Sequence, residues 1–257
     1  MESRSIVKDS AGKPVQIKGL EKASLVDYPG KVCAVAFLPG CNFRCPYCQN
    51  PDLINRPGEL PNVSEQELFG LLKARGKWLD AVCITGGEPC LHAGLPGLVR
   101  RIKGLTRALP ASGHSEAGFL VKLDTNGTNP RMLRQLLGEK LLDYVAMDIK
   151  GPLEKYAEIA GAPVDLRKIE ESIGLIKNSG IDYEFRTTVL PRLVSEQDLL
   201  KIGKWLAGSR RFAIQQFRPL VTLDPAYRDE KQYPPEGLER FKKLLLPYFQ
   251  EVEMRGV

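Results

Sequence analysis

Apolar runs alternate with amphipathic stretches along most of the 257-residue chain. Longer segments with a helix-like period separate the apolar runs, and this alternation is typical of βα units around a parallel sheet. Six units are fewer than the eight of a closed barrel. The pattern therefore predicts an α/β fold, a partial (open) TIM-like barrel of about six parallel βα units. The six candidate strands lie at residues 32–38, 81–85, 118–124, 144–149, 183–189 and 212–217.

Helix start signals agree with this pattern. Ser64 with Glu67, and Ser195 with Asp198, have the spacing of capping boxes. Each precedes a stretch in which apolar residues recur every three or four positions. We expect each of these stretches to form a helix that packs one face against the sheet.

The two ends of the chain extend this core. Residues 1–30 form a short lead-in to the first strand, and residues 235–257 predict a C-terminal extension of one amphipathic helix and a short strand at 252–254. The polar, proline-containing residues 223–235 predict a mobile surface loop. Because glycine and proline are spread through the loops without marking a linker, we expect a single domain over residues 1–257.

Composition narrows the class of protein. With 43% hydrophobic residues the chain can bury a substantial core, and its longest apolar run is far shorter than the roughly 20 residues of a membrane-spanning helix. We therefore expect a soluble, cytoplasmic protein without a membrane partner. The net charge of +6 is modest, and its basic residues are interspersed with acidic ones. This favours solvated faces over nucleic-acid binding.

Three cysteines follow the first predicted strand with the spacing Cys-x3-Cys-x2-Cys: Cys41, Cys45 and Cys48. Gly40 and Pro46 provide turn residues that let such a loop wrap around one centre. Three ligands are one short of a closed structural zinc site or an ordinary iron–sulfur site, and an open position is typical of a centre that does chemistry. An open iron centre is therefore the leading hypothesis.

Other interpretations of these cysteines remain open at this point. A zinc knuckle needs a fourth ligand at short range, whereas the two histidines, His92 and His114, lie far downstream. The pair Cys45 and Cys48 also has the spacing of a thiol redox motif. A disulfide framework is not favoured, because six cysteines are sparse for 257 residues and no secretory signal is visible.

Unusual residues also follow the next three predicted strands. Carboxyl ends of parallel strands meet at one edge of a sheet, so we expect these residues to share a rim with the cysteine loop. Two adjacent glycines let a ligand approach the backbone, and a carboxylate can bind an ammonium group. Taken alone, the adjacent glycines usually mark a turn, and the charged residues are equally compatible with strand-end capping. The residues are Gly86, Gly87 and Glu88 after the second strand, Asp124 and Thr125 at the third, and Asp148 and Lys150 at the fourth.

The remaining cysteines have a simpler interpretation. Cys33 and Cys83 lie within predicted strands, where a free thiol behaves as a small buried hydrophobic group. Cys90 directly follows Pro89 and lies close to the predicted rim, so its role stays open.

Together, the cysteine spacing, the Gly86-Gly87-Glu88-Pro89 segment and the βα alternation resemble the radical S-adenosylmethionine superfamily over nearly the whole chain. The strand-end segments at 124–127 and 147–150, and the lead-in at 25–31, resemble the activases of glycyl radical enzymes. Within that group the sequence is most similar to anaerobic ribonucleoside-triphosphate reductase activating proteins.

The resemblance implies a set of cofactor-binding residues. A 4Fe–4S cluster would be bound by Cys41, Cys45 and Cys48, with S-adenosylmethionine on the fourth iron. The other implied contacts are Gly86, Gly87 and Glu88 to the methionine ammonium, Asn50 and Lys150 to the cofactor, Asp124, Thr125 and Asp148 to a small monovalent cation, Tyr47 or Phe43 near the adenine, and Arg218 at the end of the last barrel strand.

It also implies the reaction. An electron from a ferredoxin or flavodoxin-like donor would cleave the cofactor to a 5'-deoxyadenosyl radical, which abstracts hydrogen from a glycine of a glycyl radical enzyme. The similarity stated above makes an anaerobic ribonucleotide reductase the expected partner. Formate-lyase activases tend to carry a histidine where this chain has Gln215-Gln216-Phe217-Arg218, which disfavours formate lyase without itself pointing to a reductase. A radical enzyme acting on another glycyl radical protein, a small molecule or another peptide, and a non-catalytic metal or thiol redox protein, are the alternatives.

Overall fold

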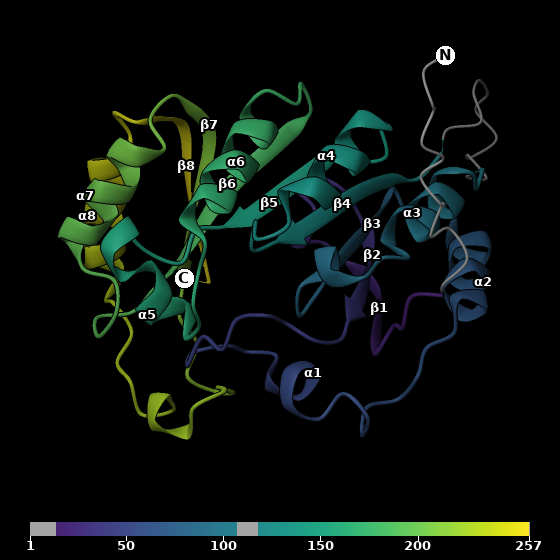
Figure 1. Ribbon diagram of the computed structural model, residues 1–257, viewed down its shortest axis with the longest axis horizontal. Coiled ribbons are helices and arrows are strands. Elements are labelled where there is room, and N and C mark those ends of the chain that lie inside the picture. Colours follow the sequence, from purple (N-terminus) through teal and green to yellow (C-terminus); the bar gives the residue numbers. More distant parts are fainter. Residues whose placement is uncertain (1–13, 107–117, 257) are drawn as a thin grey trace, which may run out of the picture.

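The structure is a computed structural model that describes residues 14–106 and 118–256. One curved eight-stranded sheet, with strands in the order β1 to β8, organises these residues (Figure 1). His114, which we expected in a loop, lies outside the described residues. The strands are β1 (Gly19–Ser24), β2 (Cys33–Leu38), β3 (Ala81–Gly86), β4 (Leu120–Thr125), β5 (Tyr144–Asp148), β6 (Asp182–Val189), β7 (Ser209–Gln216) and β8 (Phe249–Arg255).

Seven neighbouring strands, β2 to β8, run parallel, and β1 pairs antiparallel with β2. The six strands predicted from the apolar runs are all present, so the open α/β barrel is confirmed. Strands β2 to β7, each followed by a helix, are the six predicted βα units; the predicted short strand at 252–254 is part of β8, and only β1, in the lead-in, was not predicted. Among the described residues no pairing joins β8 to β1, and the barrel stays open between them.

The longer helices lie along the outer side of the curved sheet, whereas the short α1 lies below its open side (Figure 1). Both predicted capping boxes are present, at Ser64 before α2 and at Ser195 before α7. Leu68 and Leu72 of α2 are fully buried, as expected for the sheet-facing side. The helices are α1 (Pro51–Asn55), α2 (Glu65–Arg75), α3 (Leu95–Lys103), α4 (Pro130–Gly138), α5 (Tyr156–Ala160), α6 (Leu166–Lys177), α7 (Glu196–Trp205) and α8 (Pro235–Leu245).

The two faces of the sheet differ in chemistry. Between the sheet and the outer helices lies one large apolar core, in which burial provides the main stabilisation. The inner face has only a small apolar cluster, which contains the fully buried Cys33 and Cys83 next to Tyr28 and Tyr144. The prediction that both thiols are buried in strands is confirmed, and the rest of the inner face is free to carry polar groups.

The predicted C-terminal extension consists of α8 and β8, and β8 extends the sheet beyond β7. No helix in the described ranges combines the length and apolar character needed to cross a bilayer. The division of the whole chain into a single domain stays a prediction.

Candidate functional site

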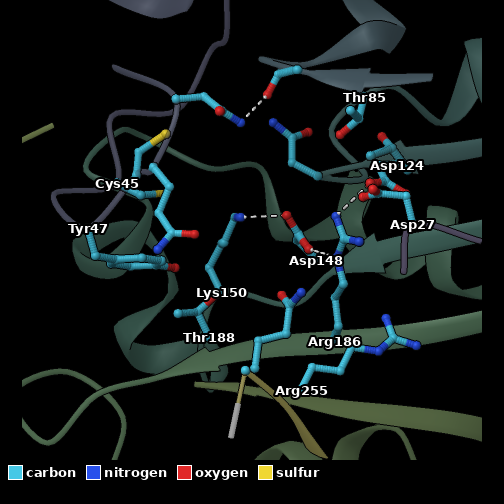
Figure 2. Close-up of a pocket in the computed structure, with 18 of the residues that line it drawn as sticks. Asp27, Cys45, Tyr47, Thr85, Asp124, Asp148, Lys150, Arg186, Thr188 and Arg255 are labelled. Carbon is cyan, nitrogen blue, oxygen red and sulfur yellow. Dashed lines mark hydrogen bonds and ion pairs between the residues drawn. The ribbon is translucent and has the colours of Figure 1, made fainter. Parts of the chain in front are cut away.

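A cavity of about 820 Å³ opens inside the barrel at the carboxyl ends of its strands. Figure 2 shows cysteine-loop residues on one side of this cavity and charged strand residues on the other. The predicted site residues that line it are Cys41, Cys45, Cys48, Asn50, Gly86, Gly87, Asp124, Thr125, Asp148, Lys150 and Arg218, together with Phe43 and Tyr47. The cavity therefore brings together the strand-end residues that the sequence pointed to, with the exception of Glu88.

The three cysteines reach the cavity from one loop between β2 and α1. The backbone N–H of Phe43 donates to Cys41 Sγ at 3.4 Å, and Asn126 Nδ2 lies 3.9 Å from the same sulfur. Cys45 is buried, and its thiol donates to the carbonyl of Ala160 at 3.7 Å. The hydrogen bonds donated to Cys41 Sγ are of the kind by which proteins stabilise and tune iron–sulfur centres, whereas the Cys45 contact needs the thiol proton and would be lost on metal binding.

Burial raises the pKa of each of the three thiols, and the ammonium of Lys150 acts in the opposite direction on each. In the described part of the chain, no three cysteine, histidine or carboxylate groups are gathered as a preformed metal site. The three thiols nevertheless share one cavity and one neighbouring cation, which fits a donor set for a thiolate-bound centre with room for a further ligand.

Gly86 and Gly87 hold the end of β3 against the start of the cysteine loop. Gly86 has a φ of +123°, and a Cβ on Gly87 would lie 1.8 Å from the carbonyl oxygen of Gly40. Gly87 N donates to Leu38 O, and Asn50 Nδ2 donates to Gly86 O at 3.4 Å. We expected the glycines to let a ligand approach; the close approach shown by the structure is between two backbone segments.

Glu88 differs from the expectation most clearly. Its side chain is fully buried and does not line the cavity. The carboxylate accepts hydrogen bonds from Cys90 N at 2.9 Å, Thr125 Oγ1 at 2.8 Å and Asn126 N at 2.6 Å. Burial raises its pKa, and these donors oppose the shift. Glu88 therefore connects the segment after β3 to the end of β4.

Asp124 and Asp148 belong to a buried ion-pair network on the inner face. Arg186 lies between them, pairing with Asp148 through Nε and with Asp124 through Nη2 at 3.2 Å (Figure 2). Lys122, whose side chain is only 2% exposed, pairs with Asp124, and Lys150 Nζ lies 2.9 Å from Asp148 Oδ2. Three protein cations thus surround two carboxylates.

The ionisation of these groups follows from their partners. Burial alone would raise the pKa of Asp148, but Arg186 and Lys150 hold it well below its ordinary value. Burial likewise opposes ionisation of Asp124, and Arg186 and Lys122 lower its pKa. Burial also acts against the charge of Lys150, but Asp148 raises its pKa well above the usual value. The five groups are therefore charged at neutral pH.

Several residues of this site were missed in the sequence. Arg186 stands beside Asp148 in the β5–β6 register, and Lys122 precedes Asp124 by two positions on the same face of β4. A lysine in the middle of an apolar strand was an available signal for an inward-facing charge. His92, taken as a loop residue, has Nε2 at 2.8 Å from the carbonyl of Pro39, just before the cysteine loop.

A family model for the radical SAM superfamily matches residues 35–206 of this chain. A protein of Methanocaldococcus jannaschii, provisionally named a glycyl-radical enzyme activating enzyme, is 32% identical over 94% of this chain and 96% of its own length. The pyruvate formate-lyase-activating enzyme of Clostridium pasteurianum is 27% identical over 91% of this chain and 88% of its own.

Solved structures show the same fold. Streptococcus suis SuiB bound to S-adenosylmethionine superposes with a TM-score of 0.62 at 15% identity, over 85% of this chain and 51% of its own. The structure titled native anSMEcpe with bound AdoMet has a TM-score of 0.53 at 19% identity, over 84% of this chain and 61% of its own. With the family match and the near full-length relative, these findings show that this chain belongs to the radical SAM superfamily, and that its homologues include activating enzymes of glycyl radical enzymes.

Proposed function

We propose that this chain is a glycyl radical enzyme activating enzyme that binds a 4Fe–4S cluster and S-adenosylmethionine and acts on an anaerobic ribonucleotide reductase. The observation that carries the proposal is the single cavity that unites Cys41, Cys45 and Cys48 with the strand-end residues of the open barrel. The match to activating enzymes over nearly the full length of the chain supports it.

In this proposal Cys41, Cys45 and Cys48, which all line the cavity, would hold the cluster. When bound, the cluster and S-adenosylmethionine would supply a 5'-deoxyadenosyl radical after reduction by a ferredoxin or flavodoxin-like protein. The backbone N–H of Phe43 on Cys41 and the nearby charge of Lys150 favour the deprotonated cysteines that iron binding requires.

The charged network would orient the bound cofactor. We propose that Lys150 pairs with its carboxylate and that Asn50 and the Gly86-Gly87 backbone contact its methionine part, since all of them line the cavity. Tyr47, whose hydroxyl is buried without a partner in the described structure, and Phe43 would lie near the adenine.

Two roles differ from those expected from the sequence. Because the Glu88 carboxylate already accepts three protein hydrogen bonds behind the cavity wall, we propose that it positions Thr125 and Asn126 instead of binding the ammonium directly. Because Lys122, Lys150 and Arg186 already surround Asp124 and Asp148, they provide the positive charge that we had assigned to a small monovalent cation.

The choice of reductase comes from the sequence resemblance, and the end of β7 argues only against formate lyase. Gln215, Gln216 and Arg218 line the cavity where formate-lyase activases tend to carry a histidine. Arg218 presents a planar guanidinium there, which can bind an anionic or carbonyl group, in place of an imidazole. This favours a partner other than formate lyase.

The test is formation of a glycyl radical. The anaerobically reconstituted chain would be mixed with S-adenosylmethionine, a reductant and either the anaerobic ribonucleotide reductase or the pyruvate formate-lyase of the same organism, and followed by electron paramagnetic resonance. We expect a glycyl radical signal on the reductase, with one 5'-deoxyadenosine formed per radical, and none with a Cys45→Ser variant.

A signal on the lyase alone would reject the reductase assignment and leave the activase assignment intact. Deuterium transfer from a labelled small molecule or another peptide into 5'-deoxyadenosine, with no radical on either protein, would instead favour one of the alternative radical SAM reactions.

A further inference from the structure

The hydroxyl of Tyr47 is buried without a hydrogen-bond partner among the described residues. Tyr47 lies between the second and third cysteines of the loop, lines the cavity and is only 5% exposed. A hydroxyl that leaves water without gaining a partner costs free energy, so native structures rarely retain one. The proposed place of the ring beside the adenine accounts for the aromatic part of this side chain, and the hydroxyl needs an explanation of its own.

The backbone that carries this tyrosine is held from two sides. Cys48 N donates to the carbonyl of Cys45 at 3.0 Å and closes a tight turn within the cysteine loop. From outside the loop, Asp224 N donates to the carbonyl of Pro46 at 2.9 Å. Residues 223–235, which we expected as a mobile loop, are thus attached to the cysteine loop. The tyrosine therefore keeps its buried position without any support from its own hydroxyl.

The groups that act on the Tyr47 hydroxyl belong to the cysteine site. Burial raises the pKa of Tyr47, Cys45 raises it further, and Lys150 opposes the shift. Burial likewise raises the pKa of the Cys45 thiol, while Lys150 and the Tyr47 hydroxyl, as a donor toward the sulfur, lower it. Figure 2 shows the Tyr47 ring beside Cys45, with its hydroxyl end toward Lys150. The hydroxyl thus interacts with the Cys45 sulfur without the alignment of a hydrogen bond.

The Cys45 sulfur changes its hydrogen-bonding character when it binds a metal. As a free thiol it donates its proton to the carbonyl of Ala160 at 3.7 Å. A thiolate ligand has lost this proton and can only accept. The carbonyl of Ala160 keeps another donor, Arg44 N at 2.8 Å, so the change leaves it satisfied. Cluster binding therefore creates an acceptor on Cys45 beside a donor that has no other partner.

We infer that the Tyr47 hydroxyl donates a hydrogen bond to the Cys45 sulfur when the cluster is bound, and that this bond raises the reduction potential of the cluster. This inference rests on the proposed function. Reduction adds negative charge to the cluster and its sulfur ligands, so a donor on a ligand sulfur stabilises the reduced state more than the oxidised state. Tyr47 then sets how readily the cluster accepts an electron from its donor protein.

The experiment is an anaerobic redox titration of the cluster-loaded chain without S-adenosylmethionine, followed by electron paramagnetic resonance of the reduced cluster. The variant is Tyr47→Phe, which removes only the hydroxyl. The matched control is Tyr156→Phe, since Tyr156 is also fully buried but its hydroxyl donates to the carbonyl of Asp148 at 3.3 Å. At a fixed solution potential we expect Tyr47→Phe to lower the ratio of reduced to oxidised cluster by up to about tenfold, equivalent to about 59 mV for a one-electron couple. Tyr156→Phe should leave the potential unchanged.

Urea denaturation of the iron-free chain gives a second measurement, with the opposite pattern. Tyr47→Phe should unfold at the same urea concentration as the wild type or a higher one, because the hydroxyl that it removes has no partner before the cluster binds. Tyr156→Phe should unfold at a lower concentration, because it loses a hydrogen bond. A purely structural role of Tyr47 would not combine unchanged stability of the iron-free chain with a lower potential of the cluster.

Equal potentials of the wild type and Tyr47→Phe would overturn the inference and leave the proposed function standing. A shift of the same size in Tyr156→Phe would also overturn it, because the potential would then respond to any nearby hydroxyl dipole. A less stable iron-free Tyr47→Phe chain would overturn it too, since the hydroxyl would already have a partner without the cluster. A wild-type chain that assembles no cluster would overturn the proposed function, and this inference with it.

Discussion

Two residues of this site, Gly87 and Glu88, hold neighbouring backbone segments in contact. Gly87 allows the end of β3 to touch Gly40 at the start of the cysteine loop, and Glu88 ties the following residues to the end of β4 through Thr125 and Asn126. The cysteines contribute chemistry only if these contacts hold their loop in place. Predictions at this scale therefore separate residues that bind iron from residues that shape the loop.

Replacing Cys41, Cys45 or Cys48 singly with serine should abolish stable iron binding, because serine cannot replace a thiolate ligand on the cluster. Iron and sulfide content after anaerobic reconstitution measures the effect. The matched control is Cys33→Ala, since Cys33 is fully buried outside the cavity lining. Full iron content in any of the three loop variants would remove that residue from the ligand set.

Replacing Gly87 with alanine should destabilise the fold by about 1–3 kcal/mol, the usual cost of overpacking, because the new Cβ would meet the Gly40 carbonyl at 1.8 Å. Urea denaturation measures this cost, and iron binding should fall with it. Gly70→Ala is the control: Gly70 lies in α2 with nothing within 4 Å of an added Cβ, so alanine there should be neutral or stabilising. Equal stability of the two variants would contradict the proposed role of Gly87.

At the scale of elements, strands β4, β5 and β6 form one charged layer. Their register aligns Asp148 with Arg186, while Lys122 and Asp124 project from β4 toward the same side. A buried ion pair adds little net stability relative to apolar packing, but removing one partner leaves an uncompensated charge. The layer therefore depends on all of its members being present.

Replacing Arg186 with glutamine should destabilise the chain by about 3–5 kcal/mol, because two buried carboxylates lose their shared partner. Arg210→Gln is the matched control, since the Arg210–Asp182 pair on β7 and β6 is more than half exposed on both sides and should contribute at most about 1 kcal/mol. Denaturant titration at pH 7 distinguishes the two. A loss below 1 kcal/mol for the Arg186 variant would mean that the network is not energetically coupled.

The network also predicts a dependence of stability on pH. The folded-state pKa of Asp124 and of Asp148 is below the ordinary value, so their contribution is present above the unfolded pKa of about 3.9 and is lost as pH falls toward the folded pKa. The free energy of unfolding should fall between pH 4.5 and pH 3, and less steeply in an Asp148→Asn variant. If the free energy of unfolding of that variant fell with pH as steeply as that of the wild type, Asp148 would be excluded as a source of the pH dependence.

Strands and helices were predicted from the sequence more completely than the contacts between side chains. All six apolar strands were predicted, because buried parallel strands form continuous apolar runs. The edge strand β1 was missed, since Glu21 and Lys22 interrupt its apolar pattern, as is common at exposed sheet edges. The partners of Asp148 and Glu88 were not predicted, because they depend on strand register and on side-chain burial, which no local pattern records.

At the scale of the whole molecule, the described residues form a barrel that carries the candidate site and remains open between β1 and β8. The outer face of the sheet packs into an apolar core. The inner face carries a layer of charged residues that reaches the cysteine loop. Asp27 of the lead-in and Arg218 beyond β7 both line the cavity although they are far apart in sequence, so the cavity is formed by the complete fold. This arrangement fits a radical SAM enzyme.

The most direct test of this account is anaerobic reconstitution with iron and sulfide, reduction with dithionite and addition of S-adenosylmethionine, followed by iron content, electron paramagnetic resonance and 5'-deoxyadenosine. The account predicts about four irons per chain for a single 4Fe–4S cluster on three cysteines, a spectrum that changes when the cofactor is added, and formation of 5'-deoxyadenosine. A chain that binds one zinc and no cluster, or a cluster whose spectrum ignores the cofactor, would contradict it.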